Sequence, residues 1–165
     1  MGNIWADIRR ILPKYLVAVV FYLFLPVYSI AQDITVNNNL EFGSVFPGVP
    51  KSISKYTAGE AAEFYISGTP NAEITIDFTL PTYMYDSGNT MVMQYSATDC
   101  AMDSSATPNQ SSPGRDNLNP WQTLTYRIGS TGLTIWLGAT VVPVLMQRPG
   151  NYSATITLTV AYTGN

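Results

Sequence analysis

The chain has 165 residues, of which 46% are hydrophobic and 12% are charged. It contains no histidine and one cysteine, so histidine-based acid–base catalysis, Ser-His-Asp and Cys-His nucleophile systems, and zinc sites built from His or Cys clusters are excluded by count. Beyond residue 31 the chain keeps five basic and ten acidic residues, and this net charge of −5 argues against nucleic acid and anionic membrane surfaces as partners. We therefore expect a protein that is not an enzyme and that uses no cofactor.

Residues 1–31 have the three parts of a secretory signal peptide. Basic residues precede an apolar run over residues 15–25, and Ser29 and Ala31 are the small residues before an expected cut. An apolar helix of this length spans about 16 Å, roughly half of a bilayer's hydrocarbon core, so a cleaved signal helix is favoured over a retained signal anchor. We expect export to the periplasm, the cell surface or the medium, with no stable membrane insertion after cleavage.

From residue 32 onward, apolar residues recur at every second position, which is the period of a half-buried strand. The clearest alternation covers residues 152–162, and another covers residues 74–80. Shorter runs bring the set to about eight strands, at residues 34–42, 52–57, 61–67, 90–95, 122–128 and 133–142. The sequence predicts one all-β domain over residues 32–165, an immunoglobulin-like antiparallel β-sandwich of about seven to eight strands, with a closed barrel as the alternative.

Residues 96–120 lack this periodicity and contain five serines, three asparagines, three prolines and three aspartates. Their composition predicts a long polar loop and favours disorder over an ordered functional loop. Cys100 lies in this segment, and no Lys or Arg stands within ten residues of it. An inert loop cysteine is therefore favoured over a reactive thiol or an intermolecular disulfide.

Carboxylates are the other residues with potential chemistry. Asp99, Asp103 and Asp116 share the polar segment, but their spacing matches no calcium loop, so we expect no metal site. Paired carboxylates can hydrolyse glycosides, and four glutamates are available for such a pair: Glu41, Glu60, Glu63 and Glu73. Each stands at a strand end or on a polar strand face, where acids are ordinarily solvated, so we expect no catalytic residues.

Aromatic residues near the middle of the chain are the best candidates for an interaction surface. If Leu80 points inward, continued pleating places Tyr83 and Tyr85 on the outer face, and Trp121 follows the polar segment. Exposed tyrosine and tryptophan stack on sugars or anchor protein interfaces. We take Tyr83, Tyr85 and Trp121 as a candidate interaction surface, although core packing is favoured for most of the aromatic residues in this part of the chain.

Two short patterns suggest a family. The segment Leu40–Gly48 (LEFGSVFPG) and the segment Pro149–Ala154 (PGNYSA), followed by an alternating strand to Tyr162, resemble the opening and closing segments of small exported bacterial β-domains. These domains are similar in style to spore coat protein U and to the pilin subunits of chaperone–usher systems. The resemblance implies a secreted β-sandwich used as a surface, coat or filament subunit. This chain departs from the pilins because one cysteine cannot form their disulfide, and because the segment before Leu40 is short for a donor arm.

A regular terminal strand can complete the sheet of a neighbouring molecule. We interpret Ile34, Val36, Leu40 and Phe42 as a candidate strand-exchange segment, with residues 150–162 beside the acceptor groove. Pairing of both segments within their own domain is nevertheless favoured over such an exchange.

The leading hypothesis is an exported, non-enzymatic structural or adhesive component of a bacterial cell surface, of pilin-like or coat type. Its expected partners are other copies of the chain or other surface subunits, with a periplasmic chaperone as a further candidate. The alternative is a monomeric secreted module that binds carbohydrate or protein.

Overall fold

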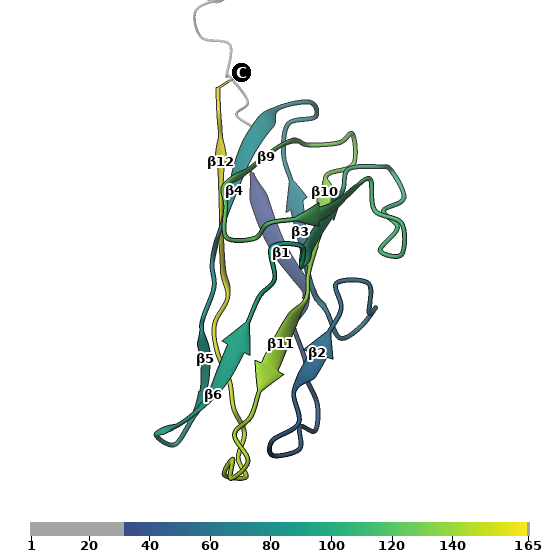
Figure 1. Cartoon of the computed structure of the whole chain (residues 1–165). Coiled ribbons are helices and arrows are strands. Elements are labelled where there is room, and N and C mark those ends of the chain that lie inside the picture. The colour runs from purple at the N-terminus through teal and green to yellow at the C-terminus, as the bar shows by residue number, and fades with distance from the viewer. Residues whose placement is uncertain (1–31, 165) are drawn as a thin grey trace, which may run out of the picture. The chain divides into compact units, whose positions relative to one another are not determined.

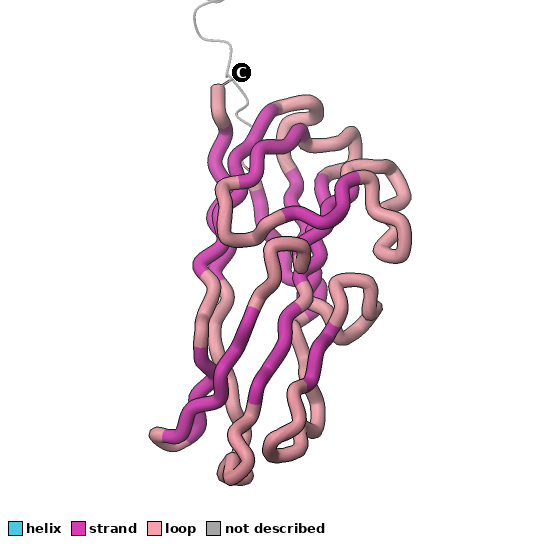
Figure 2. Tube along the Cα trace, in the orientation of Figure 1, coloured by secondary structure: helices cyan, strands magenta, loops and turns pink. Residues whose placement is uncertain are grey.

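The computed structural model describes residues 32–164, so the expected signal helix over residues 1–31 lies outside the described residues. All regular structure in the described residues is β-strand, which confirms the predicted all-β class (Figure 2). Twelve strands follow one another along the chain (Figure 1): β1 Asp33–Asn38, β2 Lys51–Ile53, β3 Ala62–Ser67, β4 Glu73–Thr79, β5 Tyr83–Asp86, β6 Asn89–Gln94, β7 Cys100–Asp103, β8 Arg115–Leu118, β9 Leu124–Arg127, β10 Leu133–Leu137, β11 Ala139–Val142 and β12 Thr157–Tyr162.

The strands pair antiparallel in three open sheets. The orders are β1-β3-β10-β7-β8, β2-β11-β6-β5 and β12-β4-β9. The second and third sheets are joined, because β4 and β5 are successive stretches of one segment and Tyr85 exchanges two backbone hydrogen bonds with Ser153, at 2.9 and 3.0 Å. These two sheets form one layer of a sandwich-like arrangement, and the five-stranded sheet forms the other.

One hydrophobic core fills the space between the layers. Along β3 and β4 buried residues alternate with more exposed ones, as the apolar pattern predicts for strands covered on one face. Phe64 of β3 meets Phe78 of β4 edge to face, with ring centroids 6.0 Å apart. All five residues of β10 are buried, because β10 lies between β3 and β7 in the middle of its sheet.

The run that the sequence predicts as one strand, residues 133–142, is shared between the two layers. β10 pairs in the five-stranded sheet and β11 pairs in the four-stranded sheet, and Gly138 stands between them. A Cβ at Gly138 would lie 2.6 Å from the carbonyl oxygen of Ile53 and 2.7 Å from the backbone nitrogen of Lys55. Only glycine allows the chain to cross at this close approach without moving the backbone.

Two sequence-based expectations are wrong. The described residues contain twelve strands and not seven or eight, because the run at residues 133–142 divides and because β5, β7 and β8 were not expected. The polar segment, residues 96–120, is not one long loop, since it contains both β7 and β8. All four residues of β7, which lies between β8 and β10 in its sheet, are buried, so this strand has no exposed face and no alternation for a sequence pattern to detect.

Lys55 holds the polar segment in place. Its ammonium group lies 2.7 Å from Oδ1 of Asp116 and donates hydrogen bonds to the carbonyl oxygen of Thr98 at 2.6 Å and to Oδ1 of Asn117 at 2.9 Å. The Lys55 carbonyl accepts a hydrogen bond of 2.7 Å from Nε2 of Gln110. One buried lysine therefore contacts the segment near its start, its middle and its end, which gives this serine-rich stretch a fixed course.

Candidate binding site

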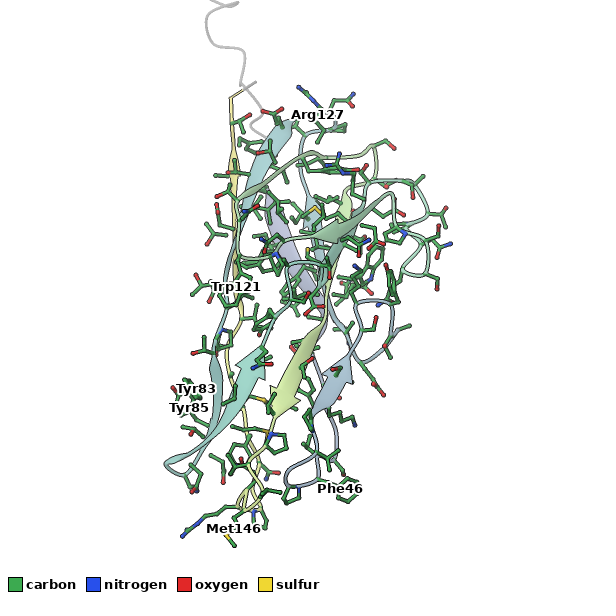
Figure 3. The ribbon with its side chains drawn as sticks, in the orientation of Figure 1. Phe46, Tyr83, Tyr85, Trp121, Arg127 and Met146 are labelled. Atoms are coloured by element: carbon green, nitrogen blue, oxygen red, sulfur yellow. The ribbon has the colours of Figure 1, made fainter. Side chains whose placement is uncertain are left out.

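The three aromatic residues that the sequence singles out are all exposed (Figure 3). Tyr83 is 43% exposed and Tyr85 is 58% exposed, while Met84 between them packs against the core. This confirms the prediction that continued pleating beyond Leu80 turns both tyrosines outward. Trp121, in the turn after β8, is about half exposed.

A groove of about 880 Å³ lies on the outer face of the four-stranded sheet. Polar side chains from three neighbouring strands form its floor, because Thr140 of β11 pairs with Ser52 of β2 on one side and with Gln94 of β6 on the other. The hydroxyl oxygens of Ser52 and Thr140 are 2.7 Å apart and share a hydrogen bond. The floor therefore presents hydroxyl and amide groups along a line across the strands.

Aromatic side chains stand over this floor. Tyr83 comes from β5, where it pairs with Val92 of β6, and Trp121 comes from outside the sheet. The indole nitrogen of Trp121 donates a hydrogen bond of 3.0 Å to the carbonyl oxygen of Tyr95. The indole also meets the Tyr95 ring edge to face, with centroids 5.9 Å apart and an interplanar angle of 86°. Trp121 is thus held in one orientation while half of its surface stays open to solvent.

The groove carries little charge. Among the described residues that line it, Asp99 alone is charged, and its carboxylate accepts a hydrogen bond of 2.6 Å from the backbone nitrogen of Ser96. Burial raises the pKa of Tyr95, so its phenol remains neutral. A lone carboxylate without a partner acid or base offers no acid–base pair. The arrangement is suited to binding a neutral, polar ligand that also has a flat apolar face.

The structure brings together only part of the predicted surface. Tyr83 and Trp121 line the groove, whereas Tyr85, two residues further along β5, pairs with Thr90 beyond its end. The floor residues were not predicted as site residues. Their only signal in the sequence is that each is a polar residue alternating with apolar ones in a predicted strand, and a sequence pattern does not tell which strands become neighbours.

The candidate strand-exchange segment pairs within its own domain. β1 is antiparallel to β3, with an irregularity between Val36 and Asn38, and it is an edge strand of the five-stranded sheet. Phe42 is buried in the core, Ile34 and Leu40 pack partly against it, and Val36 is exposed. Within the described residues β1 therefore pairs inside its own domain, which is the interpretation that the sequence favours over strand exchange. The closing strand β12 likewise pairs with β4 of the same molecule.

An open seam nevertheless separates the two layers along one side. We use the word seam for two clefts that share Leu40, Phe42 and Met84. The upper cleft, about 290 Å³, lies between residues 36–42 and residues 154–156, and the lower cleft, about 630 Å³, lies between residues 40–47 and residues 147–152. The three shared side chains are apolar: Phe42 belongs to the core, and Leu40 and Met84 pack against it.

Cys100 is not a loop cysteine, because it is a fully buried residue of β7. Burial raises the pKa of the Cys100 thiol to about 12, so it is protonated at neutral pH. No lysine or arginine is near Cys100 in the sequence, but the fold brings Lys55, two residues beyond β2, close enough to act against the effect of burial by lowering this pKa. Chemical inertness follows from burial and not from the composition of a loop.

The carboxylates are dispersed. Asp103 accepts backbone hydrogen bonds from Ser105 at 2.8 Å and from Asn109 at 3.0 Å, and Asp116 pairs with Lys55. Within residues 32–164 no three His, Cys, Asp or Glu side chains are grouped closely enough to hold a metal ion. Of the glutamates, Glu63 accepts a hydrogen bond from the Trp136 indole at 3.1 Å.

Comparison with known proteins gives one match. A family model, described as a domain of unknown function (DUF4402), matches residues 49–162, which run from just before β2 to the end of β12. No curated protein matched the chain. Among the described residues there is no helix of the length and hydropathy that a membrane span requires.

Proposed function

The chain belongs to the DUF4402 family of domains of unknown function, and we propose that it is an exported, non-enzymatic surface domain that adheres to carbohydrate. The observation that carries this proposal is the groove whose polar floor lies between Tyr83 and the fixed indole of Trp121. A domain of this kind presents a ligand site to the outside of the cell and performs no reaction.

The chemistry of the groove supports a sugar ligand. A pyranose ring has an apolar face of C–H groups and an edge of hydroxyls, and aromatic side chains provide the matching flat surface. Ser52, Gln94 and Thr140 supply donors and acceptors at the floor, where the edge hydroxyls of a stacked ring would lie. The small charge of the groove favours neutral sugars over acidic ones, since Asp99 would repel a carboxylate or sulfate.

Export and location on the surface belong to the proposal as well. They rest on the signal pattern of residues 1–31 and on the resemblance of the Leu40–Gly48 and Pro149–Ala154 segments to coat and pilin-type subunits. The absence of histidine from the sequence supports a binding role over a catalytic one.

The test is glycan binding by the mature protein and by three variants. On an immobilised glycan array, followed by titration of the best oligosaccharide by isothermal titration calorimetry, we expect Tyr83→Ala and Trp121→Ala to weaken binding at least about tenfold. Tyr85→Ala is the matched control, because Tyr85 lies on the same strand and face but outside the groove. Equal losses in Tyr83→Ala and Tyr85→Ala, or no glycan bound by the wild type, would contradict the proposal.

A second candidate function is assembly by strand pairing, which the seam favours. β1 has one strand neighbour among the described residues, so its outer edge is open to an added strand beside an apolar cleft. Main-chain hydrogen bonds to that edge would supply affinity, and alternate side chains of the added strand would enter the cleft. In such an assembly, the added strand is a segment of another subunit.

Size measurements on unheated and boiled samples in detergent test this second candidate. A strand-paired polymer gives a heat-sensitive ladder, and Val36→Asp, which puts a charge into the seam, should shorten it. Thr35→Asp is the control, because Thr35 neighbours Val36 on β1 but does not line the seam. A single monomer band before and after boiling would rule out the polymer and leave the adhesive function standing.

A further inference from the structure

Two turns place large apolar side chains in the solvent at one end of the domain. We use the term apolar tip for Phe46, Val49, Val144, Leu145 and Met146, all of which are exposed. Leu145 is 85% exposed and Met146 is 91% exposed, so these side chains contribute almost nothing to the core. Exposed apolar clusters on folded domains mark sites of interaction with proteins or membranes.

The turns that form the tip are tight and tied to each other. The backbone nitrogen of Val49 bonds to the carbonyl oxygen of Phe46 at 3.1 Å, and the nitrogen of Gln147 bonds to that of Val144 at 2.9 Å. A third hydrogen bond, from the nitrogen of Gly48 to the carbonyl oxygen of Val144 at 3.0 Å, links the two turns. The tip is therefore one rigid feature and not two independent loops.

The corner positions of the second turn hold unusual residues. Small and polar residues ordinarily occupy turn corners, because they suit the backbone and face water. Here Leu145 and Met146 occupy them. Leu145 packs over Gly48, whose φ of +70° suits glycine and where a Cβ would lie 2.7 Å from Cδ2 of Leu145. Neither the turn nor the core requires Met146 to be large and apolar.

The charge around the tip differs from that of the rest of the domain. Residues 43–50 and 143–149 contain no carboxylate, although acidic residues outnumber basic ones two to one beyond residue 31. Lys51 and Arg148 flank the two turns, and the Lys51 ammonium group lies 3.4 Å from the carbonyl oxygen of Ser44. The apolar end is thus bordered by two cations, and Asp86 lies against Gly150, two residues beyond Arg148.

The tip also lies away from the ends of the described chain. Phe46 and Met146 are at the lower end of the domain in Figure 3, whereas β12 and the C-terminus are at the upper end in Figure 1. Gln32, at the start of the described residues, donates a hydrogen bond of 3.0 Å to the carbonyl oxygen of Val160 in β12. Within residues 32–164, the apolar tip and the two ends of the described chain therefore lie at opposite ends of the domain (Figure 1, Figure 3).

We propose that the apolar tip inserts into the interfacial layer of a phospholipid bilayer. The tip is convex, and side chains as exposed as Leu145 and Met146 are buried only by an occupant that surrounds them, as lipid does and a flat protein surface does not. The cations beside the tip then lie at the depth of the lipid phosphates, with their alkyl stems in the apolar layer. Because the net charge is negative, apolar insertion and not the overall field drives binding.

Binding to vesicles of phosphatidylcholine tests the proposal. We expect the mature protein to cosediment with these vesicles and the double variant Leu145→Ser with Met146→Ser to partition at least about tenfold more weakly. Both positions are exposed, so the variant should keep the native unfolding temperature. Tyr162→Ser is the matched control, because it removes an exposed large side chain from β12, at the end of the domain away from the tip (Figure 1), and it should bind vesicles like the wild type.

A second measurement reports depth directly. Met146→Trp places an indole at the tip, and its emission should shift to the blue and be quenched by brominated phosphatidylcholine when vesicles are added. Failure of the wild type to bind vesicles, an unquenched indole, or equal partitioning of the double variant would each overturn the proposal. Glycan binding by the double variant should stay unchanged, so loss of the tip and loss of the groove are separable.

Discussion

Replacing the buried lysine beneath the polar segment should loosen that segment and destabilise the whole domain. Lys55→Met keeps the length of the side chain but removes the ammonium group, and with it the ion pair to Asp116 and the hydrogen bonds to Thr98 and Asn117. Thr98, Asp116 and Asn117 then lose a charged hydrogen-bond donor. Because Lys55 is buried, little water can reach its position to replace that donor.

The expected loss follows from the burial of the two charges. Removing one member of a fully buried ion pair costs about 3–5 kcal/mol, but the Asp116 side chain is 34% exposed and can be hydrated once Lys55 is gone. We therefore expect a decrease of about 2–3 kcal/mol in the free energy of unfolding, in the range of a hydrogen bond to a charged group. At about 4 °C per kcal/mol for a domain of this size, the midpoint falls by about 8–12 °C.

Thermal and urea unfolding followed by circular dichroism measure this change. Lys51→Met is the matched control, because Lys51 stands on the same stretch of chain with one contact of 3.4 Å to Ser44, and its loss should stay within about 0.5 kcal/mol. Hydrogen exchange should also accelerate at the backbone of residues 98–99 and 116–118 in Lys55→Met. If Lys55→Met and Lys51→Met unfold at the same temperature, the lysine does not hold the segment and the reasoning is refuted.

Three further predictions concern single groups. Burial acts to raise the pKa of Asp103 and of Asp116, but hydrogen bonds from backbone nitrogens to Asp103 and from Lys55 and Tyr56 to Asp116 outweigh it and lower both. Stability from these carboxylates is thus complete above the unfolded value of 3.8 and declines as the pH falls below it, and acid titration of the unfolding free energy should be flatter for Asp103→Asn. The Cys100 thiol should resist iodoacetamide at pH 8 in the native protein and react in urea, and fast native labelling would contradict its burial. Gly138→Ala should lower the free energy of unfolding by about 1–3 kcal/mol in urea titrations, because its methyl group meets backbone atoms at 2.6 and 2.7 Å, and a neutral effect would show that the crossing tolerates a side chain.

The sequence predicts those strands that have one face exposed to solvent and one face buried. Thr157 and Thr159 alternate with the half-buried Leu158 and Val160 in β12, and β4 shows the same pattern. The alternation of polar and apolar residues therefore predicts both strands. β7 escaped prediction because Cys100–Asp103 is covered on both sides and stands in serine-rich surroundings. The division of residues 133–142 between two layers depends on the approach of Gly138 to a distant strand, which no local pattern carries.

The same distinction separates the parts of the candidate site. The outward direction of Tyr83 and Tyr85 follows from pleating counted from Leu80, so the sequence predicts it. The placement of Trp121 over the four-stranded sheet depends on a hydrogen bond to Tyr95, and the floor depends on pairings between strands far apart in the chain. The apolar tip was not predicted, because leucine and methionine are typical of a core and only the turn geometry places them in solvent.

The most direct test of the central claim is a nuclear magnetic resonance titration of the isotope-labelled mature protein with the best oligosaccharide from the glycan array. Carbohydrate adhesion through the groove predicts that the Trp121 indole signal and the amide signals of Ser52, Gln94 and Thr140 shift together with one dissociation constant. The amide signals of Tyr85 and of the tip residues should not shift. Shifts that cluster on the seam or the tip and leave the Trp121 indole unmoved would contradict the account.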